Sequence, residues 1–160
     1  MRHLLLKLIL PLALLPSQAR ASNDIDTLSL HPARYADARE ALVDAIEGEG
    51  LVPAPPSRFG EMLARTGKDL GQPDPVYEEA EVLHFCSAPI AWQLARANPA
   101  NIAGCPLSMA IYTLPGEDRR VHLAWHIPQG NTPAHAAARQ LLTRIAQQTR
   151  QNAGRSSLNP

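Results

Sequence analysis

Hydrophobic and polar residues alternate along this chain with two different periods, which separate expected strands from expected helices. The clearest strand is residues 119–127, because every second residue from Val121 onward is apolar. The clearest helix is residues 33–47, where apolar residues recur every three or four positions with acidic residues opposite. Gly48 and Gly50 follow it, and glycine favours the end of a helix. The pattern therefore predicts both kinds of element.

The same patterns extend over the rest of the chain. They predict five strands, at residues 23–30, 51–52, 76–85, 107–114 and 119–127. They predict helices at residues 33–47, in a short segment capped by Ser57, at 88–97, and from Thr132-Pro133 to about 148. The short helix is expected to turn Phe59, Met62, Leu63 and Thr66 inward, and residues 82–85 are expected to be buried on both faces. Helices alternating with strands and followed by a hairpin indicate one α+β domain, a mixed sheet with helices on one face and a C-terminal helix.

The first 21 residues have the three parts of a secretory signal sequence. A basic start is followed by a leucine-rich run over residues 4–15 and by Ala19-Arg20-Ala21, a typical cleavage site. Lys7, Pro11 and Pro16 interrupt the apolar run, which is shorter than the roughly 20 residues that a spanning helix needs. We therefore expect cleavage near Ala21, no stable membrane anchor, and a periplasmic or secreted product. The domain is expected over residues 22–150, with a flexible tail at 151–160.

Charge narrows the classes of partner. The 160 residues contain 15 Lys and Arg against 15 Asp and Glu. Removal of residues 1–21 takes away Arg2, Lys7 and Arg20 but no acidic residue, which leaves 12 against 15 and a net charge of −3. A mildly acidic product argues against a nucleic-acid-binding function, since that requires an excess of positive charge.

Cys86 is the first candidate functional residue. It follows an expected strand and comes just before an expected helix, where the helix dipole lowers the pKa of a thiol. The alternative is a buried cysteine that only fills space.

Cys105 is the second cysteine, and export places both in an oxidising compartment, which favours a disulfide. If the strands before and after residues 88–97 are parallel, however, the two cysteines lie at opposite ends of the sheet. Their separation is then about 15 Å, against a limit of about 7 Å between the Cα atoms of a disulfide. Both possibilities stay open from spacing alone.

The histidines offer a second kind of site. His84 and Cys86 are two residues apart on one strand face, about 7 Å, and could share a metal ion with His122 or His126 from a neighbouring strand. His122 and His126 are about 13 Å apart along one strand and cannot chelate an ion together. No established metal-binding motif accompanies them, so solvated sheet histidines are the simpler explanation. The sequence indicates no particular cofactor.

Residues 77–128 resemble the domain-of-unknown-function 302 family. The resemblance is carried by Val82-Leu83-His84-Phe85-Cys86, by the helix from Trp92 to Asn98-Pro99, and by Cys105-Pro106-Leu107. It extends over about residues 25–128 and leaves the C-terminal helix outside. In the family pattern an asparagine stands between the first cysteine and the proline, and a proline precedes the second cysteine. Here the segments read Cys86-Ser87-Ala88-Pro89 and Gly104-Cys105-Pro106.

The resemblance implies a small two-layer fold with a mostly antiparallel sheet, often found as a homodimer, and no agreed activity. It also gives more weight to Cys86 and Cys105 as a functional or bridged pair. The first hypothesis is a non-enzymatic binding or accessory protein with a redox, sulfur or metal link and an unidentified ligand or protein partner. The second is a thiol enzyme with Cys86 as nucleophile and Cys105 as resolving thiol. The third is a structural dimerisation module with a Cys86–Cys105 disulfide. The absence of a complete catalytic motif favours the first.

Overall fold

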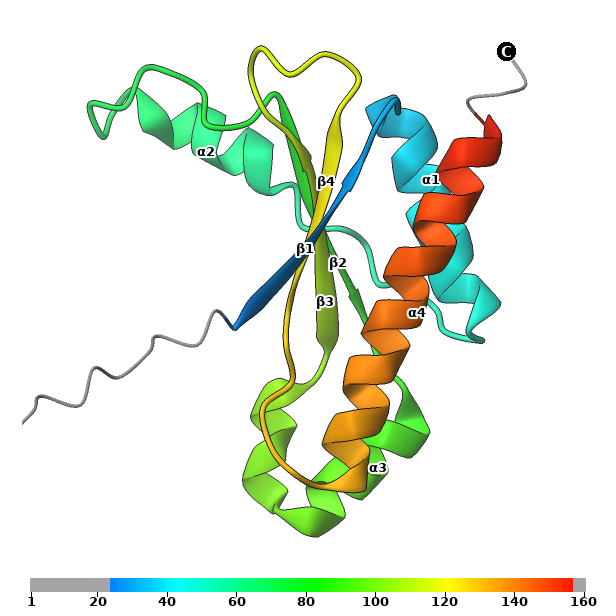
Figure 1. Ribbon diagram of the computed structural model, residues 1–160. Coiled ribbons are helices and arrows are strands. Elements are labelled where there is room, and N and C mark those ends of the chain that lie inside the picture. Colours follow the sequence, from blue (N-terminus) through cyan, green and yellow to red (C-terminus); the bar gives the residue numbers. More distant parts are fainter. Residues whose placement is uncertain (1–23, 157–160) are drawn as a thin grey trace, which may run out of the picture.

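The computed structural model describes residues 24–156, which contain four strands, four α-helices and one 3-10 helix (Figure 1). The strands are β1 (Ile25–Leu30), β2 (Glu79–Phe85), β3 (Leu107–Thr113) and β4 (Val121–His126). The helices are α1 (Tyr35–Gly48), α2 (Phe59–Gly67), α3 (Ala88–Ala97), the 3-10 helix η1 (Pro99–Gly104) and α4 (Pro133–Ser156). The predicted signal sequence, residues 1–21, lies outside the described residues.

The four strands form one antiparallel sheet in the order β1-β4-β3-β2. The predicted α+β class is confirmed, but the sheet has four strands rather than about five. The expected strand at residues 51–52 is wrong, because Pro53, Pro55 and Pro56 lack the N–H groups that a strand must donate. This segment runs beside β2 and bonds to it only through Ala54 and Ser57.

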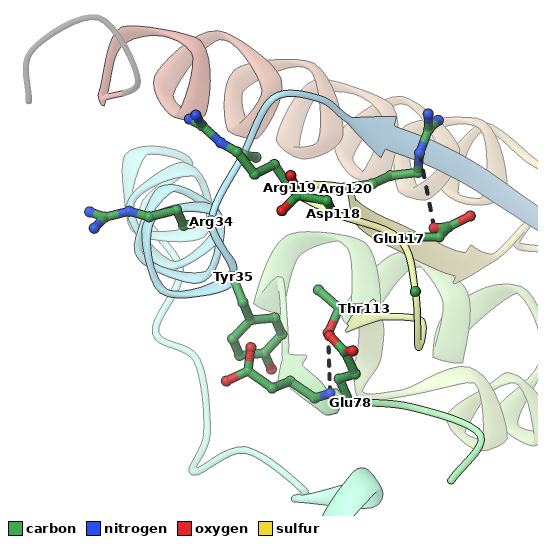
Figure 2. A pocket seen from close by; sticks show the side chains of 11 residues that line it. Arg34, Tyr35, Glu78, Thr113, Glu117, Asp118, Arg119 and Arg120 are labelled. Atoms are coloured by element: carbon green, nitrogen blue, oxygen red, sulfur yellow. Dashed lines mark hydrogen bonds and ion pairs between the residues drawn. The ribbon is translucent and has the colours of Figure 1, made fainter. Parts of the chain in front are cut away.

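The hairpin between β3 and β4 closes one end of the sheet and lies close to the start of α1 (Figure 2). Two residues within it, Gly116 and Arg119, have positive φ angles, of 79° and 49°. Glycine takes this conformation without strain, whereas an arginine does so only in a constrained turn. The backbone N–H of Ala33 donates to the carbonyl of Arg119, which ties the hairpin to the chain entering α1.

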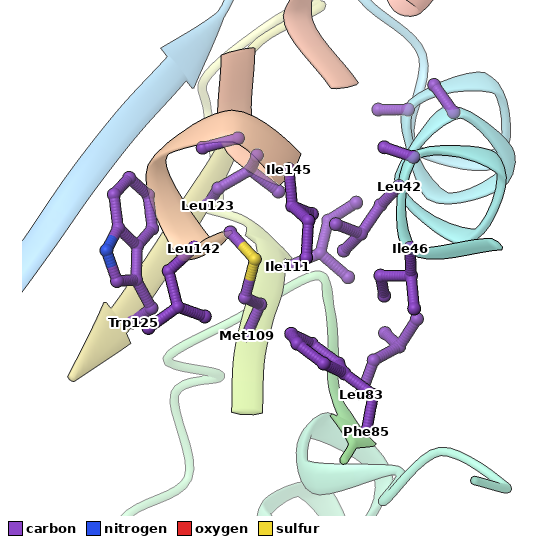
Figure 3. Close-up of a cluster of buried hydrophobic side chains, with 14 of the residues drawn as sticks. Leu42, Ile46, Leu83, Phe85, Met109, Ile111, Leu123, Trp125, Leu142 and Ile145 are labelled. Atoms are coloured by element: carbon purple, nitrogen blue, oxygen red, sulfur yellow. The ribbon is translucent and has the colours of Figure 1, made fainter. Parts of the chain in front are cut away.

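α1 and α4 cover one face of the sheet and bury the core against it (Figures 1 and 3). Alternate residues of β3 and β4 supply this face, which confirms the strand period read from the sequence. The two helices contact each other, and both bury several alanines, which are small enough to let helix backbones approach closely. The largest buried side chains include Leu42, Ile46, Phe85, Met109, Ile111, Leu123, Leu142 and Ile145.

α4 is longer than the sequence indicated. It continues to Ser156, so the expected flexible tail from residue 151 is helical over its first residues. Thr149 and Ala153 extend the buried stripe of the helix beyond Ile145, and the hydroxyl of Thr149 donates to the carbonyl of Ile145. Packing against α1 and the sheet thus holds a segment whose composition is polar.

The other face of the sheet, which carries Val82, Ala110 and His122 and is called the open face, is only partly covered. α2 extends from its β2 edge, and none of its residues is buried, so the expectation that Phe59 and Met62 point into a core is wrong. In β2 only Leu83 and Phe85 are buried, while Val82 and His84 are half-buried on the open face. Burial of residues 82–85 on both faces is therefore also contradicted, because the helices pack on one side alone.

Candidate functional site

Cys86 and Cys105 are the first and last residues of the segment 86–105, whose two ends lie beside each other at the end of the β2–β3 pair. β2 and β3 pair antiparallel with Phe85 opposite Leu107, so the residue after β2 and the residues before β3 are neighbours. Between its two ends this segment forms α3 and η1, which connect β2 to β3. The expected separation of about 15 Å assumed parallel strands, and the antiparallel register overturns it.

The two cysteine side chains lie close enough for each to influence the other, and both carry free thiols. Cys86 is exposed and Cys105 is half-buried. Burial raises the pKa of the Cys105 thiol above its usual value, and the charge of Cys86 and a hydrogen bond between the two side chains raise it further. The pair therefore has one accessible sulfur and one that keeps its proton at neutral pH.

The local structure of the segment 86–105 fixes the positions of both cysteines. Cys86 comes just before Ser87, the extended N-cap residue of α3, and Pro89 stands in the first turn. The side chain of Asn101 donates to the carbonyl of Leu94, which joins η1 to α3. η1 then ends at Gly104, and Cys105 follows in extended conformation ahead of β3. Two short helices bonded to each other thus return the chain to its starting point.

His84 takes part in the edge of the sheet rather than in the cysteine pair. Its Nε2 lies 3.2 Å from the hydroxyl oxygen of Ser57, and its carbonyl accepts from the backbone N–H of Ala54. In the register of β2 and β3 it stands opposite Ser108. These bonds hold the proline-containing segment against β2.

The two histidines of β4 have different environments. His122 lies 2.6 Å from a carboxylate oxygen of Glu117 and 3.1 Å from the hydroxyl of Ser29, and its ring stacks on Tyr112. His126 is exposed at the far end of the strand. Within residues 24–156 no three His, Cys, Asp or Glu side chains are close enough to hold a metal ion. The structure thus does not bring the candidate metal ligands Cys86, His84, His122 and His126 together.

A cavity of about 460 Å³ lies at the hairpin end of the sheet, away from the cysteines (Figure 2). Carboxylates and guanidinium groups share its walls, and several of them already form ion pairs, such as Arg120 with Glu117. The hydroxyl of Tyr35 is buried beside it and has no hydrogen-bond partner among the described residues. Burial and the nearby carboxylates of Glu81 and Glu79 raise the pKa of Tyr35, so the phenol stays protonated.

A second cavity, of about 440 Å³, lies at the cysteine end. Gly104 and Pro106, the chain neighbours of Cys105, both line it, together with residues of β4 and α4. Asn101, His135 and Gln129, which also line it, stood outside every motif considered in the sequence. Only the antiparallel register, which is a long-range property, could have shown that they surround one space.

The fold is that of a small α+β domain, with a four-stranded antiparallel sheet and two long helices on one face. Residues 27–156 match the family described as Domain of unknown function DUF302, and the chain belongs to that family. The match includes α4, so the expectation that the C-terminal helix lies outside the family is corrected. The crystal structure of an uncharacterized conserved protein, DUF302, from Bacillus stearothermophilus has a similar fold, with a TM-score of 0.63 and 16% identity, covering 81% of this chain and 100% of that one.

No curated protein matches the chain. None of the helices in residues 24–156 is long and apolar enough to cross a membrane.

Proposed function

We propose that this chain is an exported accessory domain in which Cys86 and Cys105 form a reversible dithiol–disulfide pair. The proximity of the two thiols, at the two ends of the segment 86–105, carries the proposal. The register of Phe85 with Leu107, continued by one residue, sets Cys86 against Pro106, the residue next to Cys105. A disulfide requires Cα atoms within about 7 Å, and the proposal requires the two cysteines to reach that distance.

The chemistry is thiol–disulfide exchange with a disulfide of a partner molecule. The Cys86 thiolate attacks one partner sulfur, the partner's S–S bond breaks, and its second sulfur leaves as a thiolate with the bonding electrons. Cys105 then loses its proton to solvent and attacks Cys86 Sγ. The mixed disulfide breaks, the Cys86–Cys105 bond forms, and the remaining partner sulfur leaves as a thiolate. Two electrons pass from the cysteine pair to the partner.

Exposure assigns the order of attack. Cys86 is exposed at the end of β2, so a partner disulfide can reach its sulfur. Cys105 is half-buried and its pKa is raised, so it reacts second, after Cys86 has formed the mixed disulfide. Because the described residues gather no third metal ligand beside the pair, the proposal is sulfur exchange and not metal-dependent chemistry.

The test uses oxidised glutathione and the reduced protein, with products followed by mass spectrometry. The natural chain is expected to release reduced glutathione twice and to end with an internal disulfide. The Cys105→Ser variant should stop as a stable glutathione adduct at Cys86, whereas the Cys86→Ser variant should react much more slowly. Glutathione adducts on both cysteines of the natural chain, with no internal disulfide, would overturn the proposal.

Export is the second part of the proposal, and residues 1–21 support it. The test is expression of the full chain in a bacterium, followed by fractionation and N-terminal sequencing. We expect the chain in the periplasmic fraction to begin at Ser22. Retention in the cytoplasm with residues 1–21 intact would remove the oxidising compartment from the argument, while the thiol exchange could still be measured on purified protein.

We also propose a homodimer, formed through the open face of the sheet. The supporting observation is that this face combines small apolar residues with half-buried Val82 and Tyr112, whereas α1 and α4 pack on the opposite face. Light scattering on the eluting protein should give twice the chain mass. Ala110→Arg, at the centre of the open face, should give a monomer, and Thr143→Arg on the exposed side of α4 should not. A natural chain that elutes as a monomer contradicts this proposal.

A further inference from the structure

The sheet divides at the end that carries the cysteines. β3 and β4 pair only at three positions, from Ala110 opposite Ala124 to Tyr112 opposite His122. Below these positions β3 continues along β2, while β4 continues along β1 as far as His126. The two central strands therefore separate, and the cavity of about 440 Å³ lies between their ends, within the size range of small-molecule pockets.

The walls of this cavity have an apolar part and a polar part. Leu94 of α3, Leu107 of β3 and Leu142 of α4 supply the apolar part. Asn101, Ser108, His126, Gln129 and His135 supply the polar part. Such a wall fits a ligand with an apolar body and one polar group.

The charges around the cavity favour an anion. Of the lining residues that the structure describes, none is an Asp, Glu, Lys or Arg, so the two histidines are the groups in the wall that can carry charge. α4 begins at Pro133 beside the cavity, and its first turn contains no acidic residue to offset the positive end of the helix dipole. The guanidinium group of Arg139 donates to the carbonyl of Pro128, which is in the wall, and to the carbonyl of Gly130, two residues further along the chain.

His135 is held in a fixed position. Its Nδ1 lies 2.7 Å from the hydroxyl oxygen of Thr132. A Cβ atom at Gly130, which has a φ of +127°, would lie 2.6 Å from the imidazole ring. The glycine therefore gives the ring the space in which it packs, and the hydroxyl sets its orientation. A preorganised imidazole costs less entropy when it binds a ligand than a mobile one.

We propose that this cavity binds a small carboxylate with an apolar body, such as a short aliphatic acid. The carboxylate lies toward His126, His135 and the start of α4, and the apolar body lies against Leu94, Leu107 and Leu142. The site is independent of the thiol chemistry proposed above, although Gly104 and Pro106 place it next to Cys105.

The test uses three probes of equal length and different charge: hexanoate, hexanamide and hexylamine. Each is titrated into isotopically labelled protein, and amide shifts are followed by NMR. We expect hexanoate to bind most tightly, hexanamide more weakly, and hexylamine not at all, with shifts confined to α3, η1 and the adjoining ends of β3, β4 and α4. Equal or tighter binding of hexylamine, or hexanoate shifts spread over the whole surface, would overturn the proposal.

Matched glycine variants locate the binding site. A side chain at Gly104 would extend into open space, and the same is true of Gly154 at the far end of α4. Gly104→Leu adds a bulky side chain at the wall of the cavity and is expected to weaken hexanoate binding at least about tenfold, whereas Gly154→Leu leaves it unchanged. Unchanged hexanoate affinity in a folded Gly104→Leu variant contradicts the assignment.

Two double variants test whether the histidines and the cysteines take part in hexanoate binding. His126→Gln combined with His135→Gln should abolish the preference for hexanoate over hexanamide while hexanamide still binds. Cys86→Ser combined with Cys105→Ser should retain hexanoate binding. Loss of binding in the serine variant would make the cavity part of the dithiol site, and retention of the hexanoate preference in the glutamine variant would refute the role of the histidines.

Discussion

The two faces of the sheet differ in what covers them, although the same strands supply both. On the face beneath α1 and α4, Leu83, Met109 and Ile111 are at most 2% exposed. Their neighbours Val82 and Ala110 are half-buried on the opposite face, which the two long helices leave uncovered. Adjacent residues in one strand thus contribute in different ways: one set holds the fold together, and the other remains available for recognition. The following predictions test that division.

The largest effect is expected from a large-to-small change on the covered face. Leu83→Ala should lower the free energy of unfolding by about 2–5 kcal/mol, because it removes buried surface and leaves a cavity. Val82→Ala is the matched change on the open face and should cost less than about 1.5 kcal/mol. Urea unfolding followed by circular dichroism measures both, at protein concentrations low enough for the chain to be monomeric. Equal losses in the monomer would contradict the division between the two faces.

The ion pair between Arg39 of α1 and Glu81 of β2 lies at the edge of the covered face. Arg39→Met should cost about 1–3 kcal/mol, because the Glu81 carboxylate, whose side chain is 17% exposed, loses its partner. The double change Arg39→Met with Glu81→Leu should recover much of that loss, since neither charge remains to be solvated. A double variant less stable than Arg39→Met would mean that the two side chains stabilise the fold by more than neutralising each other's charge.

On the open face, the His122 ring contacts Ser29, Glu117 and Tyr112. His122→Ala should lower the free energy of unfolding by about 1 kcal/mol, which is the usual contribution of a hydrogen-bonded and stacked side chain at a partly solvated site. His126→Ala, at the exposed end of the same strand, should change it by less than about 0.5 kcal/mol. A smaller loss for His122→Ala than for His126→Ala would contradict the assigned contacts.

The smallest effect is expected at the surface between α1 and α4, where Arg144 donates two hydrogen bonds to Glu49. These bonds lower the pKa of the Glu49 carboxyl in the folded protein. Their contribution is therefore present above the ordinary glutamate pKa and is lost as the pH falls through the lowered value. Arg144→Gln should cost less than about 1 kcal/mol at neutral pH, and the difference from the natural chain should disappear in acid. A difference that persists in acid would point to lost packing instead.

Local patterns predicted much of this fold. The alternation in β4 identified its covered face, since the period of a strand depends only on neighbouring residues. The stripe of α1 and the glycine that follows it were equally local. The end of α4 was missed because Gln151 and Asn152 are polar, although Thr149 and Ala153 continue the buried stripe. The spacing of these two buried residues, and not the polar composition around them, indicates where the helix ends.

Long-range pairing was the part that the sequence could not supply. Nothing in residues 86–105 shows whether the chain returns parallel or antiparallel, because that choice depends on how β3 pairs with β2 and β4. The proximity of Cys86 and Cys105 follows from the register of Phe85 with Leu107 and from no local motif. The cavity beside Cys105 depends in addition on where β3 and β4 separate.

The proline-containing segment beside β2 has a consequence for how many copies of the chain can join through their sheets. Because Pro53, Pro55 and Pro56 offer no N–H groups, that edge cannot accept another full strand. Within residues 24–156, no further strand pairs with the opposite edge, β1. Strand addition between copies can therefore join one β1 to another β1, after which both outer edges of the joined sheet are blocked. An assembly made in this way stops at two chains and does not grow into a fibre.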